Sequence, residues 1–213
     1  MATPGHGSDG PLHESETNMK FYDCRTAPSP RRVRIFLAEK GVDVPTEQVD
    51  LRTGAHFTDA FRAVNPSCTV PALILDDGTA ITESMAICRY FEETNPEPPL
   101  MGTDARDRAV VEMWQRRIEI EAFLAVAEAL RNAAKGLKGR ALPGPEDYEQ
   151  IPELAARGRA RVMAFYDKIE PQLGTNEFVA GPRYTVADIS ALVAFDFAHR
   201  LDLAFPEAHR NLR

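Results

Sequence analysis

The chain has 213 residues, enough for one large domain or two modest ones, and its hydrophobic content of 44% is ordinary for a globular protein. The formal net charge of -7 argues against nucleic-acid binding, and no apolar run reaches the length of a membrane-spanning helix. Three cysteines, Cys24, Cys68 and Cys88, cannot all pair with one another, which favours a reduced, cytoplasmic protein.

Residues 1–18 are rich in Gly, Pro, Ser, Thr and acidic residues and have no signal-peptide hydrophobic core. A segment of this composition buries too little apolar surface to fold, so we expect a disordered leader.

The next segment has the pattern of a strand, a helix and a second strand. We expect a strand over Phe21–Cys24, a helix over Arg31–Lys40 and a second strand over residues 42–50. Ser29, which stands before a proline, is a suitable N-cap for the helix, and Gly41 is a suitable C-terminal cap. A connection of this kind is right-handed and makes the two strands parallel.

A β-hairpin is predicted after an irregular segment that ends near Val64. Residues 72–75 form a short apolar run, Asp76-Asp77-Gly78 is a turn sequence, and residues 79–81 return as the second strand. With the two earlier strands, the hairpin completes a four-stranded mixed sheet.

Two dipeptides flank this hairpin. Val70-Pro71 stands just before its first strand, where a residue without an N–H is tolerated. Glu83-Ser84 follows its second strand and opens an apolar-periodic stretch over residues 85–91, which predicts a helix. A strand that leads into a helix N-terminus is a suitable site for a carboxylate.

Prolines between residues 96 and 99 rule out a continuing helix, so we place a linker at residues 97–103 between domains at 19–96 and 104–213. The second domain is predicted to be helical, first over residues 104–135. After a Gly/Pro-rich loop, apolar residues recur at helical spacing over residues 154–173.

A further helix is predicted to begin at Thr185, which opens a capping-box sequence completed by Asp188. Tyr184 precedes it as one half of a hydrophobic staple. In that helix, Phe195 and Phe197 are typical packing positions.

Val70-Pro71 and Glu83-Ser84, in this order around a hairpin, resemble the glutathione-binding half of the soluble glutathione S-transferases. The resemblance runs from about Lys20 to the chain end and is to the bacterial-like branch with a Thr-Ala-Pro-x-Pro loop. It implies an α/β thioredoxin-like domain followed by an all-α domain. It also implies an enzyme that activates glutathione as a thiolate for attack on a small electrophile.

The resemblance assigns glutathione-binding residues. A cis bond between Val70 and Pro71 would let the backbone pair with the cysteinyl part of glutathione, and Glu83 with Ser84 would hold the γ-glutamyl end. Gly54-Ala55-His56 resembles a Gly-x-His that contacts the glycyl carboxylate in some branches. His56 fits a solvated surface loop equally well, and Arg52 is a weaker alternative.

The residue that activates the thiol is less clear, because Ala27 stands where the family usually has Ser or Cys. Thr26, Ser29 and the backbone amides of the loop remain as candidates. Thr26 is preferred because Ser29 already has the predicted capping role. Cys24 is expected to be structural. Cys68 lies where the family often has glycine, and we expect a small buried residue there.

The resemblance implies glutathione as co-substrate, no metal, no nucleic-acid or membrane partner, and a homodimer. Its electrophile pocket, for a small hydrophobic molecule, would lie beside the first long helix of the second domain. The possible contributors are Trp114, Gln115, Arg116, Glu119 and Phe123.

Three alternatives remain open. A glutathione-dependent isomerase or a peroxidase would use the same glutathione site. The isomerase branch typically has a Ser-Ser-Cys cluster, which Ala27-Pro28-Ser29 lacks. A non-catalytic relative that binds glutathione weakly or acts as an interaction protein would explain Ala27, but a pure scaffold has no need of a γ-glutamyl clamp. Family members usually continue through another helix beyond the position of Arg213, so we expect either a short protein or a fragment.

Overall fold

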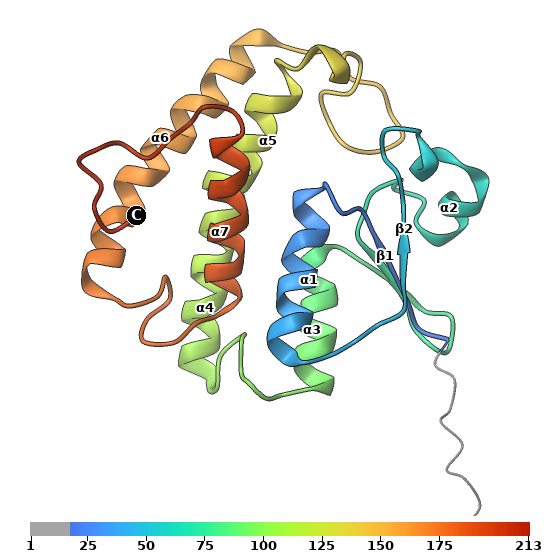
Figure 1. Ribbon diagram of the computed structural model, residues 1–213, viewed down its shortest axis with the longest axis horizontal. Helices are drawn as coiled ribbons and strands as arrows, with labels where there is room; N and C mark the ends of the chain where they lie inside the picture. The colour runs from blue at the N-terminus through green and yellow to red at the C-terminus, as the bar shows by residue number, and fades with distance from the viewer. Residues whose placement is uncertain (1–17) are drawn as a thin grey trace, which may run out of the picture.

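The computed structural model describes residues 18–213, in which a mixed β-sheet with its helices precedes an all-helical part (Figure 1). All but one residue of the predicted leader lie outside the described residues. The strands are β1 (Lys20–Asp23), β2 (Thr46–Gln48), β3 (Ala72–Ile74) and β4 (Ala80–Thr82). The helices of this part are α1 (Pro28–Lys40), η1 (Ala55–Phe57), α2 (Asp59–Val64) and α3 (Ser84–Thr94).

The four strands form the predicted mixed sheet, with β1 parallel to β2 and β3 antiparallel to β4. The strand order is β2-β1-β3-β4, and β1 is antiparallel to β3. β1 is central, and its Phe21 lies opposite Leu73 of β3. Both side chains are buried and belong to the apolar cluster that α1 and α3 complete with Val33, Phe36 and Ile87. β2 is shorter than predicted because its residues are exposed at the sheet edge.

Helix α1 begins three residues earlier than predicted, which corrects the role given to Ser29. The N-cap is Ala27, and Pro28 occupies the first helical position, where its missing N–H costs nothing. Ser29 therefore lies inside the first turn and does not cap the helix. At the other end Gly41 is the C-cap, in the left-handed conformation with φ 64°.

A buried ion pair fixes the segment after α3. The Lys40 side chain is fully buried, and its Nζ lies 2.6 Å from a Glu92 carboxylate oxygen and 2.9 Å from the carbonyl oxygen of Asn95. Glu92 also accepts hydrogen bonds from the N–H groups of Leu100 and Met101. The chain between α3 and the next helix is thereby anchored to α1 and α3.

The second part is helical, and none of its helices, nor any other in residues 18–213, is long and apolar enough to cross a bilayer. Its elements are α4 (Ala105–Arg117), η2 (Ile118–Phe123), α5 (Leu124–Arg131), η3 (Lys135–Leu137), α6 (Pro152–Thr175) and α7 (Val186–His199). The predicted helix over residues 104–135 is thus interrupted by η2, a π-helical segment.

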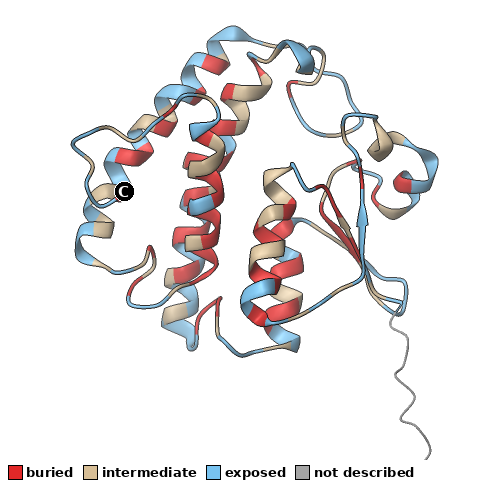
Figure 2. Cartoon of the chain, viewed as in Figure 1, coloured by how far each residue is buried: buried red, intermediate tan, exposed pale blue. Residues whose placement is uncertain are grey.

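Helix α7 is the centre of this part and faces α1 across the boundary, as Figures 1 and 2 show. Thr185 and Asp188 form the predicted capping box, and Asp188 also accepts the N–H of Val179 at 2.7 Å. Ile189 and Val193 are buried, which explains the dense red of this helix in Figure 2. The alignment of α1 and α7 determines what surrounds the loop before α1.

Candidate functional site

The loop between β1 and α1 is held by a buried carboxylate. Asp23, only 2% exposed, accepts a hydrogen bond from Gln48 (Nε2 to Oδ2, 2.6 Å) and an ion-pair contact from Arg34. Arg34 donates from Nη2 to the carbonyl of Arg25 at 3.1 Å. Because one side chain spans β1 and the loop, the residues that follow Arg25 have a defined position.

Thr26 is exposed at this loop, and its Oγ1 lies 3.5 Å from Sγ of Cys24. β1 ends at Asp23, one residue earlier than predicted, so Cys24 is the first residue of the loop. Its side chain is nevertheless buried. The structure thus places Thr26 as the solvent-facing hydroxyl of the loop, with the Cys24 sulfur behind it.

The first turn of α1 limits the backbone donors available beside Thr26. Pro28 and Pro30 carry no N–H, so Ser29 and Arg31 supply the only backbone N–H groups among its first four residues. Ala27 has an extended backbone and offers no side-chain cap. The start of α1 therefore offers two backbone N–H groups to an anion, and Thr26 lies in the loop just before it.

The segment before β3 carries the predicted cis-proline. The Val70–Pro71 bond is cis, as the resemblance predicts. Asn65, 1% exposed, holds this segment from within: its Nδ2 donates to the carbonyl of Thr69 at 2.8 Å, and its Oδ1 accepts the N–H of Ser67 at 3.0 Å. Sequence reasoning passed over Asn65, although an Asn before a proline is a turn signal.

Cys68 lies in the same turn and is buried, as expected. Its φ is 52°, in the left-handed region that side chains rarely adopt and glycine adopts freely. This conformation explains why glycine is common at the corresponding position of the family.

Glu83 and Ser84 join β4 to α3. Glu83 is exposed, with φ 73°, and makes no side-chain cap bond to the helix. Ser84 is 3% exposed at the first helical position, and its Oγ donates to the carbonyl oxygen of Ser29 at 2.9 Å. The predicted γ-glutamyl clamp is therefore in direct contact with the first turn of α1.

His56 lies on η1 and is half-buried. Gly54 precedes it with φ 76°, a conformation that explains the glycine of the Gly-x-His sequence. Burial lowers the pKa of His56, and the positive charges of Arg140 and Arg131 lower that pKa further. Arg52, by contrast, has an 87% exposed side chain and contacts Asp50, which makes it the less suitable of the two candidates for a fixed ligand contact.

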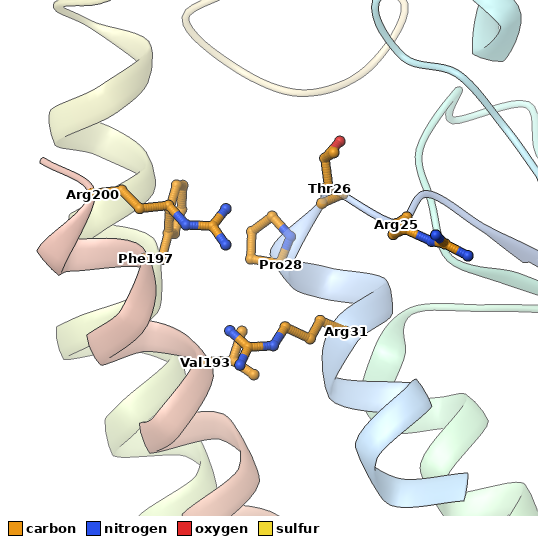
Figure 3. Close-up of a pocket in the computed structure, with 8 residues that line it drawn as sticks. Arg25, Thr26, Pro28, Arg31, Val193, Phe197 and Arg200 are labelled. Atoms are coloured by element: carbon orange, nitrogen blue, oxygen red, sulfur yellow. The ribbon is translucent and has the colours of Figure 1, made fainter. Parts of the chain in front are cut away.

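A small hollow adjoins the Thr26 loop on the side of α7 (Figure 3). Pro28 and Phe197 face each other across it, and the guanidinium groups of Arg31 and Arg200 point toward it. Phe197 also packs against the ring of Phe123, as predicted for a packing position. It therefore has two roles, packing within the helical part and lining the hollow. Arg200 was missed, because nothing in the sequence places the end of α7 beside residue 26.

The residues predicted to line the electrophile pocket from the first long helix are either buried or ion-paired. Trp114, Gln115 and Phe123 are buried at 7%, 1% and 6% exposure, and none of them lines the hollow beside Thr26. Glu119 accepts contacts from Arg32 of α1 at 3.1 Å and from Arg116 at 2.8 Å. The ion pair between Arg32 and Glu119 joins α1 to the helical part.

Within residues 18–213, no group of three or more His, Cys, Asp or Glu side chains is arranged to hold a metal ion.

Comparison with known proteins decides the family. Residues 26–94 match the N-terminal domain of the glutathione S-transferases, and residues 123–213 match their C-terminal domain. Glutathione S-transferase 2 of Saccharomyces cerevisiae is 34% identical over 198 residues, which cover 92% of this chain and 82% of the yeast protein. The chain belongs to the glutathione S-transferase family.

Solved structures agree with this assignment. A glutathione S-transferase domain-containing protein of Marinobacter aquaeolei has a TM-score of 0.84 at 36% identity, covering 91% of this chain and 93% of the other. Gtt2 of S. cerevisiae has a TM-score of 0.81 at 33% identity, covering 91% and 92%. Fold and activity class, a glutathione transferase, are those that the sequence predicts.

The similarity to maleylacetoacetate isomerase of Pseudomonas aeruginosa covers only part of this glutathione S-transferase. Maleylacetoacetate isomerase of Pseudomonas aeruginosa is 42% identical, but over only 98 residues, which are 43% of this chain and 46% of that protein. The match to glutathione S-transferase 2 spans both parts of the fold, whereas the isomerase match spans less than half of it.

Proposed function

We propose that this transferase activates glutathione at the start of α1, with the Thr26 hydroxyl as the donor to the ligand sulfur. The observation that carries this assignment is the 2.9 Å hydrogen bond between Ser84 and the Ser29 carbonyl. This bond supports the proposal because it holds Ser84, the proposed γ-glutamyl ligand, against the turn that follows Thr26. A ligand held by Ser84 and by the backbone beside Pro71 would then present its sulfur to the Thr26 loop.

The chemistry required of the loop is to make a thiolate available at neutral pH. A free cysteine thiol has a pKa of about 8.5, so little of it is ionised at pH 7. A hydroxyl that donates to the sulfur stabilises the thiolate over the thiol, and the partial positive charge of a helix N-terminus acts in the same direction. The thiol proton passes to solvent.

The thiolate then attacks the electrophilic carbon, and a new C–S bond forms. With an aryl halide the bond from carbon to halogen breaks, and halide leaves with the electron pair. The protein supplies a stabilised thiolate and proximity of the two reactants. In this proposal, the hollow between Pro28 and Phe197 accommodates one face of a small hydrophobic electrophile beside the sulfur.

Conjugation of a generic aryl halide at fixed glutathione tests this reaction directly. Wild-type protein should turn over, and Thr26→Ala should lose turnover near neutral pH while glutathione affinity changes little. Thr26→Ser, which keeps a hydroxyl, should retain most of the activity. Equal activity of wild type and Thr26→Ala would contradict the role of Thr26, and a wild type that binds glutathione without turnover would contradict catalysis.

We also propose a cytoplasmic homodimer. The cysteines Cys24, Cys68 and Cys88 are unpaired and buried, which suits a reducing compartment. Met113, Ile120 and Leu124 are large apolar side chains left exposed along α4 to α5, at 39%, 41% and 51%. Sedimentation equilibrium should give twice the chain mass of 23.6 kDa, and the monomer mass at micromolar concentration would contradict the dimer.

A further inference from the structure

A cation at the end of α7 lies beside the hollow that adjoins the Thr26 loop. Arg200 is the C-cap residue of α7, and its side chain extends from the helix end toward Pro28 (Figure 3). A cation at a helix C-terminus is favourable without any ligand when it pairs with the last carbonyl groups. The Arg200 guanidinium does not do so, because within residues 18–213 it has neither a hydrogen bond nor an ion pair.

The other residues of the hollow leave this charge unbalanced. In the described part of the chain, no acidic side chain lines the hollow, whereas Arg25 and Arg31 do. The guanidinium of Arg25 points away from the hollow in Figure 3. Arg31 is paired with Asp196, one turn before Arg200 in α7, with 2.6 Å between Nη1 and Oδ2. The charge of Arg200 is therefore the uncompensated one, in a chain whose net charge is -7.

The walls of the hollow are apolar and held in place. Val193 is 1% exposed and belongs to the core of the helical part. The ring of Phe197 packs against Phe123, with 6.2 Å between the ring centroids. Pro28 is the first residue of α1, so the helix fixes the direction of its ring. A flat apolar group in contact with Pro28 and Phe197 would lie beside the Arg200 guanidinium (Figure 3).

A ligand in this position would take water away from the guanidinium. Removal of water from a charge costs free energy unless the ligand brings a counter-charge. A carboxylate or a sulfonate brings that charge, with oxygen atoms that match the fork of N–H donors on an arginine. A neutral apolar ligand of the same shape would bring only the apolar contact.

We propose that the hollow selects electrophiles in which a small apolar frame carries an anionic group, and that Arg200 binds this group. The inference rests on the proposed function, since the glutathione thiolate must reach the electrophile from the Thr26 loop. The covalent step is unchanged: the C–S bond forms, and the leaving group departs with the electron pair. Asp196 limits the selection, because its pair with Arg31 lowers the positive charge beside the hollow.

Two aryl chlorides that differ in charge but little in shape test this selection. A chlorodinitrobenzoate, with its carboxylate para to the chlorine, is an anion at neutral pH, and the corresponding benzamide is neutral. For each substrate, kcat/KM is divided by the rate constant of the uncatalysed reaction with glutathione, which removes the difference in intrinsic reactivity. Wild type should prefer the benzoate by roughly three- to tenfold, between the effect of an exposed ion pair and that of a charged hydrogen bond.

Three variants separate the charge of Arg200 from other effects. Arg200→Gln should abolish the preference and leave the benzamide rate and the KM for glutathione unchanged. Asp196→Asn should increase the preference, because it leaves the charge of Arg31 unpaired. Arg210→Gln is the matched control, since it removes the same charge from an exposed residue that does not line the hollow, and it should change neither rate.

Equal normalised rates for the two substrates in wild type, or an equal loss for both in Arg200→Gln, would overturn the selection. A higher KM for glutathione in Arg200→Gln, with the preference for the benzoate intact, would also overturn it and assign the guanidinium to glutathione. Absence of turnover with both substrates in wild type would overturn the proposed function, and this inference with it.

Discussion

Ser84, at the start of α3, donates its hydroxyl hydrogen to the backbone carbonyl of Ser29 in the first turn of α1, at 2.9 Å. The two residues are 55 positions apart in the chain. The contact joins the helix start proposed to hold the γ-glutamyl end of glutathione to the helix start proposed to activate its sulfur. A side chain in this position affects ligand binding and the geometry of the loop together.

Ser84→Ala should weaken glutathione binding, because in the proposed complex the hydroxyl hydrogen turns from the Ser29 carbonyl to the γ-glutamyl carboxylate. Loss of a hydrogen bond to a charged group costs about 1.5–3 kcal/mol, and each 1.4 kcal/mol is a factor of about ten in affinity. Calorimetry should show roughly a ten- to a hundredfold increase in Kd. Ser29→Ala is the matched control, because it keeps the backbone carbonyl that accepts from Ser84 and removes no helix cap. The affinity of this variant for glutathione should stay close to that of wild type. Equal loss in both variants would contradict the role of the Ser84 hydroxyl.

Lys40→Met should destabilise the fold strongly. The Lys40 side chain is fully buried against Glu92, and removal of one partner from a buried pair costs about 3–5 kcal/mol, because the other charge stays buried and unpaired. Denaturant unfolding measures the loss. Arg89→Met removes one partner of an exposed pair with Glu93, 3.6 Å apart, and should cost about 0.5 kcal/mol or less. Similar losses for the two variants would contradict the assignment.

Gly158→Ala should also lower the free energy of unfolding. A Cβ at Gly158 would lie 2.6 Å from the carbonyl oxygen of Ala125 and 2.7 Å from the amide nitrogen of Ala129, so α5 and α6 would have to separate. Overpacking costs about 1–3 kcal/mol, which outweighs the gain of about 1 kcal/mol in helix propensity. At Gly136, where nothing lies within 4 Å, the same change should be neutral or stabilising. A stabilised Gly158→Ala would show that the helices separate at no cost.

Local sequence signals predicted the hairpin and the capping box at Thr185, and the family resemblance predicted the cis bond before Pro71. The structure confirms all three. These features depend on residues within a few positions of one another. Ser29 shows the limit of such signals, because Pro28 and Pro30 are both acceptable near a helix start and the structure uses the earlier one.

Contacts between distant segments were not predictable from one sequence. The position of Arg200 beside Thr26 depends on the packing of α7 along α1, and that of Arg140 over Phe57 depends on the path of an irregular loop. The conversion of residues 118–123 to a π-helix likewise leaves no mark on the apolar periodicity. In each case the determining interactions are tertiary, whereas the sequence reports local preference.

A pH titration of thiolate absorbance in the glutathione complex tests the central claim, that Thr26 activates the bound thiol, most directly. The wild-type complex should show a thiol pKa well below the free value of about 8.5. A donor favours the charged form of the sulfur, so its loss in Thr26→Ala should raise the pKa toward the free value, and Thr26→Ser should restore it. An unchanged thiol pKa in Thr26→Ala would contradict the claim and leave the Ser29 hydroxyl and the backbone N–H groups of Ser29 and Arg31 as the candidate donors.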